Sequence, residues 1–321
     1  MAVYTEISDD ELRAFTALYD IGEVLSCKGI AEGVENSNYL LTTERANFIL
    51  TLYEKRVARA DLPFFIALMD HLAHHGVACP TPLRAKDGEA LRELCGRPSA
   101  IVTFLNGMWP RRIEPFHCAA LGKALAGLHL AGESFAMARA NDLGVAGWRA
   151  LYESCRERAG EWHNGIADEL GEELAFLETS WPRELPTGVI HADLFPDNVF
   201  FRDRTLSGVI DFYFACTDFL AYDIAICLNA WCFEPDLSFN VTKARLLVAS
   251  YRAARPLAVG ELTALPLLAR GSALRFLLTR LYDWLNQTEG ALVRPKDPLE
   301  YLRKLRFHRD VGGPGAYGID V

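Results

Sequence analysis

The 321-residue sequence lacks the patterns of several large protein classes. It has no block of Lys and Arg, and its formal net charge is −9, so nonspecific binding to nucleic-acid phosphates is disfavoured. Its most apolar stretch, residues 219–233, contains Asp223 and is too short to cross a bilayer. The acidic segment 1–15 lacks the apolar centre of a secretory signal. We therefore expect a cytoplasmic protein that binds neither nucleic acid nor a membrane.

The eight cysteines form no Cys-x-x-Cys pair. In a chain of this length without a signal, they indicate reduced and mostly buried thiols rather than a disulfide framework. Half of the residues are apolar and 23% are charged, which is the balance of a soluble globular protein. The length suffices for one large domain or two, with a sizeable core.

The sequence also has no Walker A motif and no complete GxGxxG motif. A looser glycine-bearing loop, residues 29–38, lies between two expected strands at 23–30 and 38–43. Small residues at such a hairpin tip let backbone N–H groups approach a phosphate, and the alternative is a plain surface loop. The candidate nucleotide contacts here are Gly29, Gly33, Ser37 and Asn38.

The sequence of the first third of the chain predicts a small sheet with two helices. A capping box at Ser8 opens a helix to about Gly22, and a second helix spans 61–76. Asp70 lies near the inner edge of the second helix, where it either pairs with a cation or is solvated. Periodicity ends at Leu105, which predicts a hinge at about 104–110 between an N-terminal lobe, 1–105, and a C-terminal lobe, 106–321. The remaining expected strands lie at 47–53, 91–95 and 99–104.

Helical patterns dominate the later part of the chain. An acidic stretch at 153–173 is either a solvated helix face or a surface that attracts a cationic substrate. In the last helix, Arg280 either pairs with Asp283 at i,i+3 or faces the cleft. The expected helices lie at 115–132, 147–160, 165–180, 218–231 and 272–287, with short strands at 188–191, 199–203 and 206–210 and a loop at 311–321.

The chemistry concentrates in His191-Ala-Asp193-Leu-Phe-Pro-Asp-Asn198 and in Asp211-Phe after the next hairpin. This spacing suits metal-assisted phosphoryl transfer, in which one carboxylate orients a hydroxyl while an amide and a second carboxylate hold Mg²⁺. Two alternatives remain open: the polar groups satisfy buried backbone atoms, or His191 and the carboxylates form a hydrolytic metal site.

Taken with these motifs, the chain resembles the aminoglycoside phosphotransferase and choline kinase superfamily, and within it the homoserine kinases. The resemblance runs from about Gly29 to Gln287 and implies an α+β, protein-kinase-like fold with an antiparallel sheet lobe and a mainly helical lobe. The stretches that carry it are Phe48-Ile-Leu-Thr-Leu-Tyr-Glu-Lys55, Leu62-Pro-Phe-Phe65, His191 to Asn198, Asp211-Phe-Tyr-Phe-Ala-Cys216, Asp223 to Trp231, and Leu274 to Trp284.

The resemblance implies a role for each motif residue. Asp193 is expected to be the catalytic base, with Asn198 and Asp211 holding Mg²⁺ on ATP. His191 and Asp223 are expected to brace the loop. The loop at 29–38 is expected to cover the nucleotide, and the backbone at 103–107, including Phe104 and Leu105, to meet the adenine.

One departure from the family pattern concerns a lysine. Kinases of this fold normally carry a lysine in the third strand that pairs with a glutamate on the next helix. The expected position holds Thr51, and the matching helix acid is Asp70. Lys55 or Lys28 is the candidate replacement.

The implied reaction is phosphorylation of L-homoserine by ATP, and these two small molecules are the expected partners. A zwitterionic substrate calls for an arginine at its carboxylate and an acid at its ammonium group. The candidate substrate contacts are Arg275, Arg280, Asp218 and Trp231. The rivals are a kinase of choline, methylthioribose or an aminoglycoside, and a non-catalytic nucleotide-binding pseudokinase.

Overall fold

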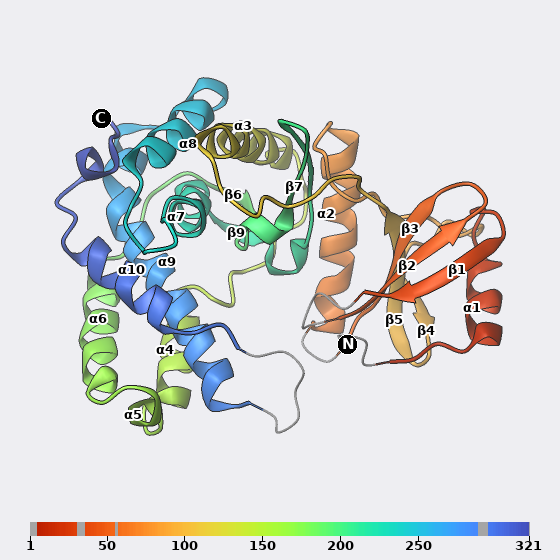
Figure 1. The fold of residues 1–321 in the computed structure, drawn as a ribbon, viewed down its shortest axis with the longest axis horizontal. Helices are drawn as coiled ribbons and strands as arrows, with labels where there is room; N and C mark the ends of the chain where they lie inside the picture. Colours follow the sequence, from red (N-terminus) through yellow and green to blue (C-terminus); the bar gives the residue numbers. More distant parts are fainter. Residues whose placement is uncertain (1–4, 31–35, 55–56, 288–294, 321) are drawn as a thin grey trace. The chain divides into compact units, whose positions relative to one another are not determined.

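The computed structural model describes residues 5–30, 36–54, 57–287 and 295–320. These residues cluster into two compact units, 1–107 with 207–213, and 108–206 with 214–321. The first contains the sheet and the second most of the helices (Figure 1). The expected α+β class, with an antiparallel sheet and a mainly helical part, is confirmed.

The N-terminal unit is built on a five-stranded antiparallel sheet (Figure 1). Along β2 the burial alternates residue by residue, which is the pattern of a sheet with one face in a core. Leu41 and Leu50, on adjacent strands, are fully buried. In spatial order the strands are β1 (Val24–Gly29), β2 (Ser37–Thr43), β3 (Asn47–Leu52), β5 (Arg97–Thr103) and β4 (Arg92–Leu94).

Helix α1 (Asp9–Thr16) packs on this sheet and ends earlier than expected. The Ser8 capping box is confirmed. After Thr16, the N–H groups of Leu18 and Tyr19 bond to carbonyls three residues back. These tighter turns end the helix and bring Tyr19 and Ile21 into the core. The second predicted helix is present as α2 (Leu62–His74).

The C-terminal unit surrounds one long helix, α9 (Val259–Leu285), against which α7, α10 and α4 pack (Figure 1). Among the described residues, α9 is the one helix that is long and apolar enough to cross a membrane. Of its most apolar window, 67% is buried. The other helices are α3 (Pro115–Gly132), α4 (Val145–Cys155), α5 (Ala159–Trp162), α6 (Ile166–Ser180), α7 (Leu220–Trp231), α8 (Val241–Ala254) and α10 (Leu299–Arg309).

Sequence patterns placed only the second half of α9, because Pro266 and Gly271 are helix breakers. Gly271 is needed there, since a Cβ at this position would lie 2.3 Å from the Trp181 ring. Tertiary packing therefore overrides the local preference. Helices α8 and α10 were missed altogether, and the expected helix at 147–160 is broken after Cys155.

Two short strand pairs complete the unit. β6 (Thr187–Ile190) pairs with β9 (Cys216–Phe219), which sequence patterns assigned to the start of α7. β7 (Val199–Arg202) forms a two-stranded sheet with β8 (Thr205–Val209). The chain between β6 and β7 holds His191 to Asn198.

Candidate active site

The loop from His191 to Asn198 follows β6 directly and has an unusual backbone. Ala192 has φ of 63°, a left-handed conformation that costs a non-glycine residue roughly 1 kcal/mol. His191 and Ala192 are buried, whereas Asp193 is partly exposed. The surrounding structure must hold this strained backbone in place, and the side chains that do so come from α7 and α9.

Asp223, at the start of α7, accepts hydrogen bonds from two successive N–H groups of the loop. The distances are 2.7 Å from the His191 nitrogen and 3.0 Å from the Ala192 nitrogen. Burial alone would raise the pKa of Asp223, but the bonds and charge from His129 and His191 lower it below its usual value. The carboxylate therefore fixes the backbone just before Asp193.

His129 lies behind Asp223 and was not singled out from the sequence. Its Nε2 is 3.2 Å from Asp223 Oδ2, and its Nδ1 is 2.7 Å from the Tyr251 hydroxyl. Both His129 and Asp223 have fully buried side chains. A histidine inside the otherwise apolar stripe of α3 was the available signal, since a buried polar group needs a partner.

Asn198 is bonded to Asp193 twice. Its Nδ2 donates to the Asp193 carbonyl at 2.8 Å and to the Asp193 carboxylate at 3.3 Å. Both hydrogen bonds are donated by the amide nitrogen, so neither of them involves the amide oxygen. An amide oxygen is among the ligands that Mg²⁺ accepts, so the Asn198 side chain suits the predicted role.

Two residues predicted to contact the substrate lie behind the loop instead. Trp231 is fully buried, and its indole N–H donates to the Leu194 carbonyl at 2.8 Å. Arg275 is 1% exposed, and its guanidinium donates to the Ala192 carbonyl. Both side chains therefore contact the loop in this structure, and their predicted contacts with a substrate stay predictions. Trp231 and Arg275 lie on the buried faces of α7 and α9.

Arg280 does not pair with Asp283 as one alternative proposed. Its guanidinium lies 2.7 Å from the Glu300 carboxylate on α10 and donates to the Asp297 carbonyl at 3.2 Å. Lys304 pairs with the same carboxylate at 2.5 Å. Burial opposes ionisation of Glu300, but the two cations lower its pKa to about 2. Two cations sharing one anion leave one excess positive charge.

Asp218, the candidate for the substrate ammonium, lies on β9. Its carboxylate accepts a bond from the Asn141 amide at 2.6 Å and another from the Phe219 nitrogen at 2.7 Å. The side chain is half-buried. An ammonium group at this carboxylate would share it with these two donors.

Asp211 belongs to the N-terminal unit with the segment 207–213. It follows β8 and has φ of 65°, a second strained backbone in the predicted motif. Two tyrosines of the same unit lie close to it, the buried Tyr53 and the half-buried Tyr213, with their hydroxyls 3.3 Å apart. Burial, with a smaller effect from Asp211, raises the pKa of Tyr213 to about 12, so both tyrosines stay protonated beside this carboxylate.

The candidate nucleotide contacts occupy the hairpin ends of the sheet. Gly29 is exposed at the end of β1, and Gly33 lies outside the described residues. The Ser37 hydroxyl donates to Glu54 at 2.8 Å, and the Asn38 amide oxygen accepts a bond from Thr51 at 2.7 Å. Both side chains are thus engaged within the sheet, and the Asn38 carbonyl accepts a hydrogen bond from the Ile30 nitrogen at 2.8 Å.

At the position of the usual strand lysine, Thr51 is 2% exposed and bonded to Asn38. Asp70 pairs with Arg84 at 2.9 Å, so it is not simply solvated. Lys28 is exposed on β1, and Lys55 lies outside the described residues. Thr51 and Asp70 therefore do not rebuild the lysine–acid pair.

The predicted adenine-binding stretch is half-buried at Phe104 and Leu105. Gly208 on β8 approaches it closely, and a Cβ there would lie 2.6 Å from the Leu105 side chain. A glycine is required at this contact, which positions Leu105 within the unit.

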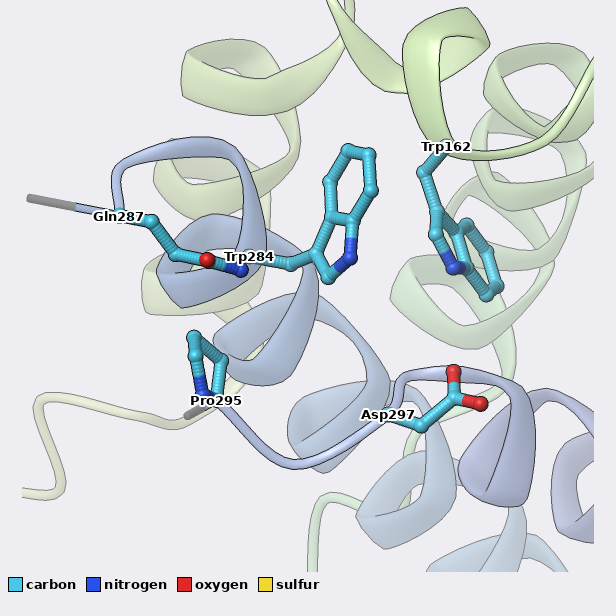
Figure 2. Close-up of a pocket in the computed structure, with 5 residues that line it drawn as sticks. All are labelled: Trp162, Trp284, Gln287, Pro295 and Asp297. Carbon is cyan, nitrogen blue, oxygen red and sulfur yellow. The ribbon is translucent and has the colours of Figure 1, made fainter. Parts of the chain in front are cut away.

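A separate cavity of about 460 Å³ opens on the C-terminal unit (Figure 2). Trp162 from α5 and Trp284 from α9 project into it, with the Asp297 carboxylate beneath them (Figure 2). Gln287 and Pro295 complete the lining. Aromatic faces with a nearby carboxylate are suited to an ammonium group. None of the predicted site residues lines this cavity.

Comparison with known proteins gives the family. Residues 26–257 match the model of the phosphotransferase enzyme family. Homoserine kinase of Paramagnetospirillum magneticum is 66% identical over the whole of both chains, and that of Rhodospirillum rubrum is 63% identical over 99% of each. A spectinomycin phosphotransferase has the same fold at 13% identity, with a TM-score of 0.69 over 98% of both chains. The chain therefore belongs to the phosphotransferase enzyme family and, within it, to the homoserine kinases.

Proposed function

We propose that this chain transfers the γ-phosphoryl group of ATP to the side-chain hydroxyl of L-homoserine, with Asp193 as catalytic base. The product is O-phospho-L-homoserine, a precursor for threonine synthesis. The observation that carries the assignment of Asp193 is the pair of hydrogen bonds that the Asn198 amide donates to it. These bonds hold a partly exposed carboxylate in one orientation. The full-length identity to homoserine kinases supports the substrate.

In this mechanism the protein positions groups and supplies few covalent steps. The homoserine oxygen attacks the γ-phosphorus, the bond to the ADP oxygen breaks, and the hydroxyl proton passes to Asp193. The Asn198 amide donates a hydrogen bond to this carboxylate and so orients it to accept that proton. Asp223 and His191 hold the loop backbone in the strained conformation that presents Asp193.

Asn198 and Asp211 would hold Mg²⁺, through one amide oxygen and one carboxylate. When bound, the ion neutralises charge on the ATP phosphates. We assign nucleotide binding to lobe 1–105, through backbone groups near Gly29, Gly33, Ser37 and Asn38 and at Phe104 and Leu105. Lobe 106–321 would carry catalysis and substrate binding, with the hinge at about 104–110, in the cytoplasm.

For the substrate carboxylate we propose Arg280. The excess positive charge that it forms with Lys304 and Glu300 favours an anion, and Arg280 is 8% exposed. Asp218 remains the candidate for the ammonium group. Replacing Arg280 by Met should raise KM for homoserine by about 10-fold or more, while KM for ATP stays within about 2-fold.

One observation favours a second substrate class. The cavity with Trp162, Trp284 and Asp297 suits a quaternary or primary ammonium compound, so a choline-like alcohol is the alternative acceptor. A coupled assay of ATP consumption with homoserine, choline, methylthioribose and kanamycin separates the two. We expect kcat/KM for homoserine to exceed that of the others by about 100-fold or more.

Turnover of choline or kanamycin with none of homoserine would overturn the substrate assignment. ATP binding without turnover of any alcohol would favour the non-catalytic pseudokinase.

A further inference from the structure

We infer that Arg275 is a positioning residue for catalysis, which clamps the peptide between Ala192 and Asp193 from behind the catalytic loop. This inference rests on the proposed role of Asp193. It reassigns the buried arginine from the substrate to the loop backbone, and it gives α9 a direct part in setting the orientation of the base.

The clamp has a donor and an acceptor side. The Arg275 guanidinium donates to the Ala192 carbonyl, the acceptor end of the peptide that precedes Asp193. At the other end of that peptide, the Asp193 N–H donates to His191 Nδ1 at 3.3 Å. Rotation of this peptide about the chain would break both bonds, so the two together fix the direction in which the Asp193 side chain leaves the backbone.

Asp223 holds the peptide before it. Its carboxylate accepts the Ala192 N–H at 3.0 Å, so Ala192 has an anion at its N–H and a cation at its carbonyl. Ala192 is also the residue with the left-handed backbone. A conformation that the residue itself disfavours therefore persists through two charged groups contributed by α7 and α9.

The environment of Arg275 argues against a purely structural role. The side chain is 1% exposed, and within the described part of the chain it makes no ion pair with a carboxylate. Its other contacts include Tyr222 and the rings of Phe276 and Phe214, whose centres lie 4.3 Å and 5.7 Å from the guanidinium carbon. An apolar side chain of similar size would fill this space without the desolvation of a charge. The hydrogen bond to the Ala192 carbonyl ties this buried charge to the loop.

The test compares Arg275→Met with Arg275→Lys, and uses Arg270→Met as the matched control. Arg270 lies on the same helix but pairs with Glu173, away from the loop. We expect Arg275→Met to lower kcat by about 100-fold while both KM values stay within about 3-fold of the parent. Arg275→Lys, which keeps a charged donor, should recover at least about 10-fold of that loss.

A substrate contact would behave differently: KM for homoserine would rise by about 30-fold or more with kcat retained, and this result would overturn the inference. An equal loss of kcat in Arg270→Met, at an equal loss of Tm, would overturn it as well. If Arg275→Met does not fold, hydrogen exchange of residues 190–198 in Arg275→Lys decides. Faster exchange than in the parent supports the clamp, and parental exchange contradicts it.

The exchange measurement also separates this inference from the proposed function. If the parent protein does not phosphorylate homoserine, the function fails, while the effect of Arg275 on exchange of the loop amides is still measured.

Discussion

His129 Nε2 lies 3.2 Å from Asp223 Oδ2, and both side chains are fully buried. The same Asp223 carboxylate accepts hydrogen bonds from the N–H groups of His191 and Ala192 in the loop. The loop from His191 to Asn198 is therefore braced by side chains of α3 and α7. Removing one partner of a buried pair leaves the other uncompensated, which is costly.

Replacing His129 by Leu should destabilise the protein by about 3 kcal/mol, and should lower kcat as the loop loses its brace. Tyr251→Phe is the matched control, because it removes only the hydroxyl on the far side of the ring. It should cost about 1 kcal/mol and leave kcat within about 3-fold. Urea unfolding and steady-state kinetics measure both. Unchanged stability in His129→Leu would contradict the brace.

The Asn198 amide should set the requirement for Mg²⁺. Asn198→Ala removes both bonds to Asp193 and the proposed ligand oxygen. We expect kcat to fall by about 100-fold or more and the Mg²⁺ concentration for half-maximal activity to rise by about 10-fold. A titration of activity against Mg²⁺ at saturating ATP measures this. A fall in kcat with an unchanged Mg²⁺ midpoint would assign Asn198 to Asp193 alone.

Close packing of α3 on α8 depends on Gly122. A Cβ at this position would lie 2.0 Å from the Leu247 carbonyl oxygen, so Gly122→Ala must push the two helices apart. We expect a loss of about 3 kcal/mol in the free energy of unfolding. Gly127, on the same helix, has nothing within 4 Å of its Cβ position. Gly127→Ala should therefore stabilise the protein by about 0.5–1 kcal/mol, since alanine favours helix.

The buried His308 predicts a pH dependence of stability. It lies between the Tyr317 hydroxyl at 2.6 Å and Asn229 Oδ1 at 3.0 Å, and burial, with the nearby Lys304 charge, lowers its pKa to about 3. In the unfolded chain this histidine is protonated near the ordinary histidine pKa, whereas in the folded state it stays neutral at that pH. The contribution to stability is therefore full above about pH 6.5 and falls as the pH decreases toward 3.

Between pH 7 and pH 5 this residue should reduce the free energy of unfolding by about 2 kcal/mol. Urea unfolding of the parent and of His308→Gln at the two pH values isolates the effect. The parent should lose more stability than the variant, and equal losses would show that His308 is not held neutral.

The sequence was most informative where one motif combines spacing with local structure. The strand, loop and hairpin around Asp193 and Asn198 follow from short-range patterns, and the structure has them at the expected positions. The capping box at Ser8 is equally local and is confirmed.

Long-range packing was the part that the sequence could not supply. The guanidinium of Arg275 contacts a carbonyl 83 residues away, and His129 contacts a carboxylate 94 residues away. No spacing rule links such residues, so a buried arginine was read as a substrate contact. The first half of α9 was not predicted for a related reason. Gly271 is suited to this helix because two tryptophan rings pack on it, which the local sequence does not show.

The central claim, that Asp193 is the base of an ATP-dependent homoserine kinase, is tested most directly by single-turnover phosphorylation of homoserine in Asp193→Asn. Asp197→Asn, an exposed carboxylate of the same loop that pairs with Lys296, is the matched control. We expect Asp193→Asn to slow phosphoryl transfer by about 10²–10⁴-fold while ATP binding is retained, and Asp197→Asn to stay within about 3-fold of the parent. A rate for Asp193→Asn within a few-fold of the parent would contradict the account.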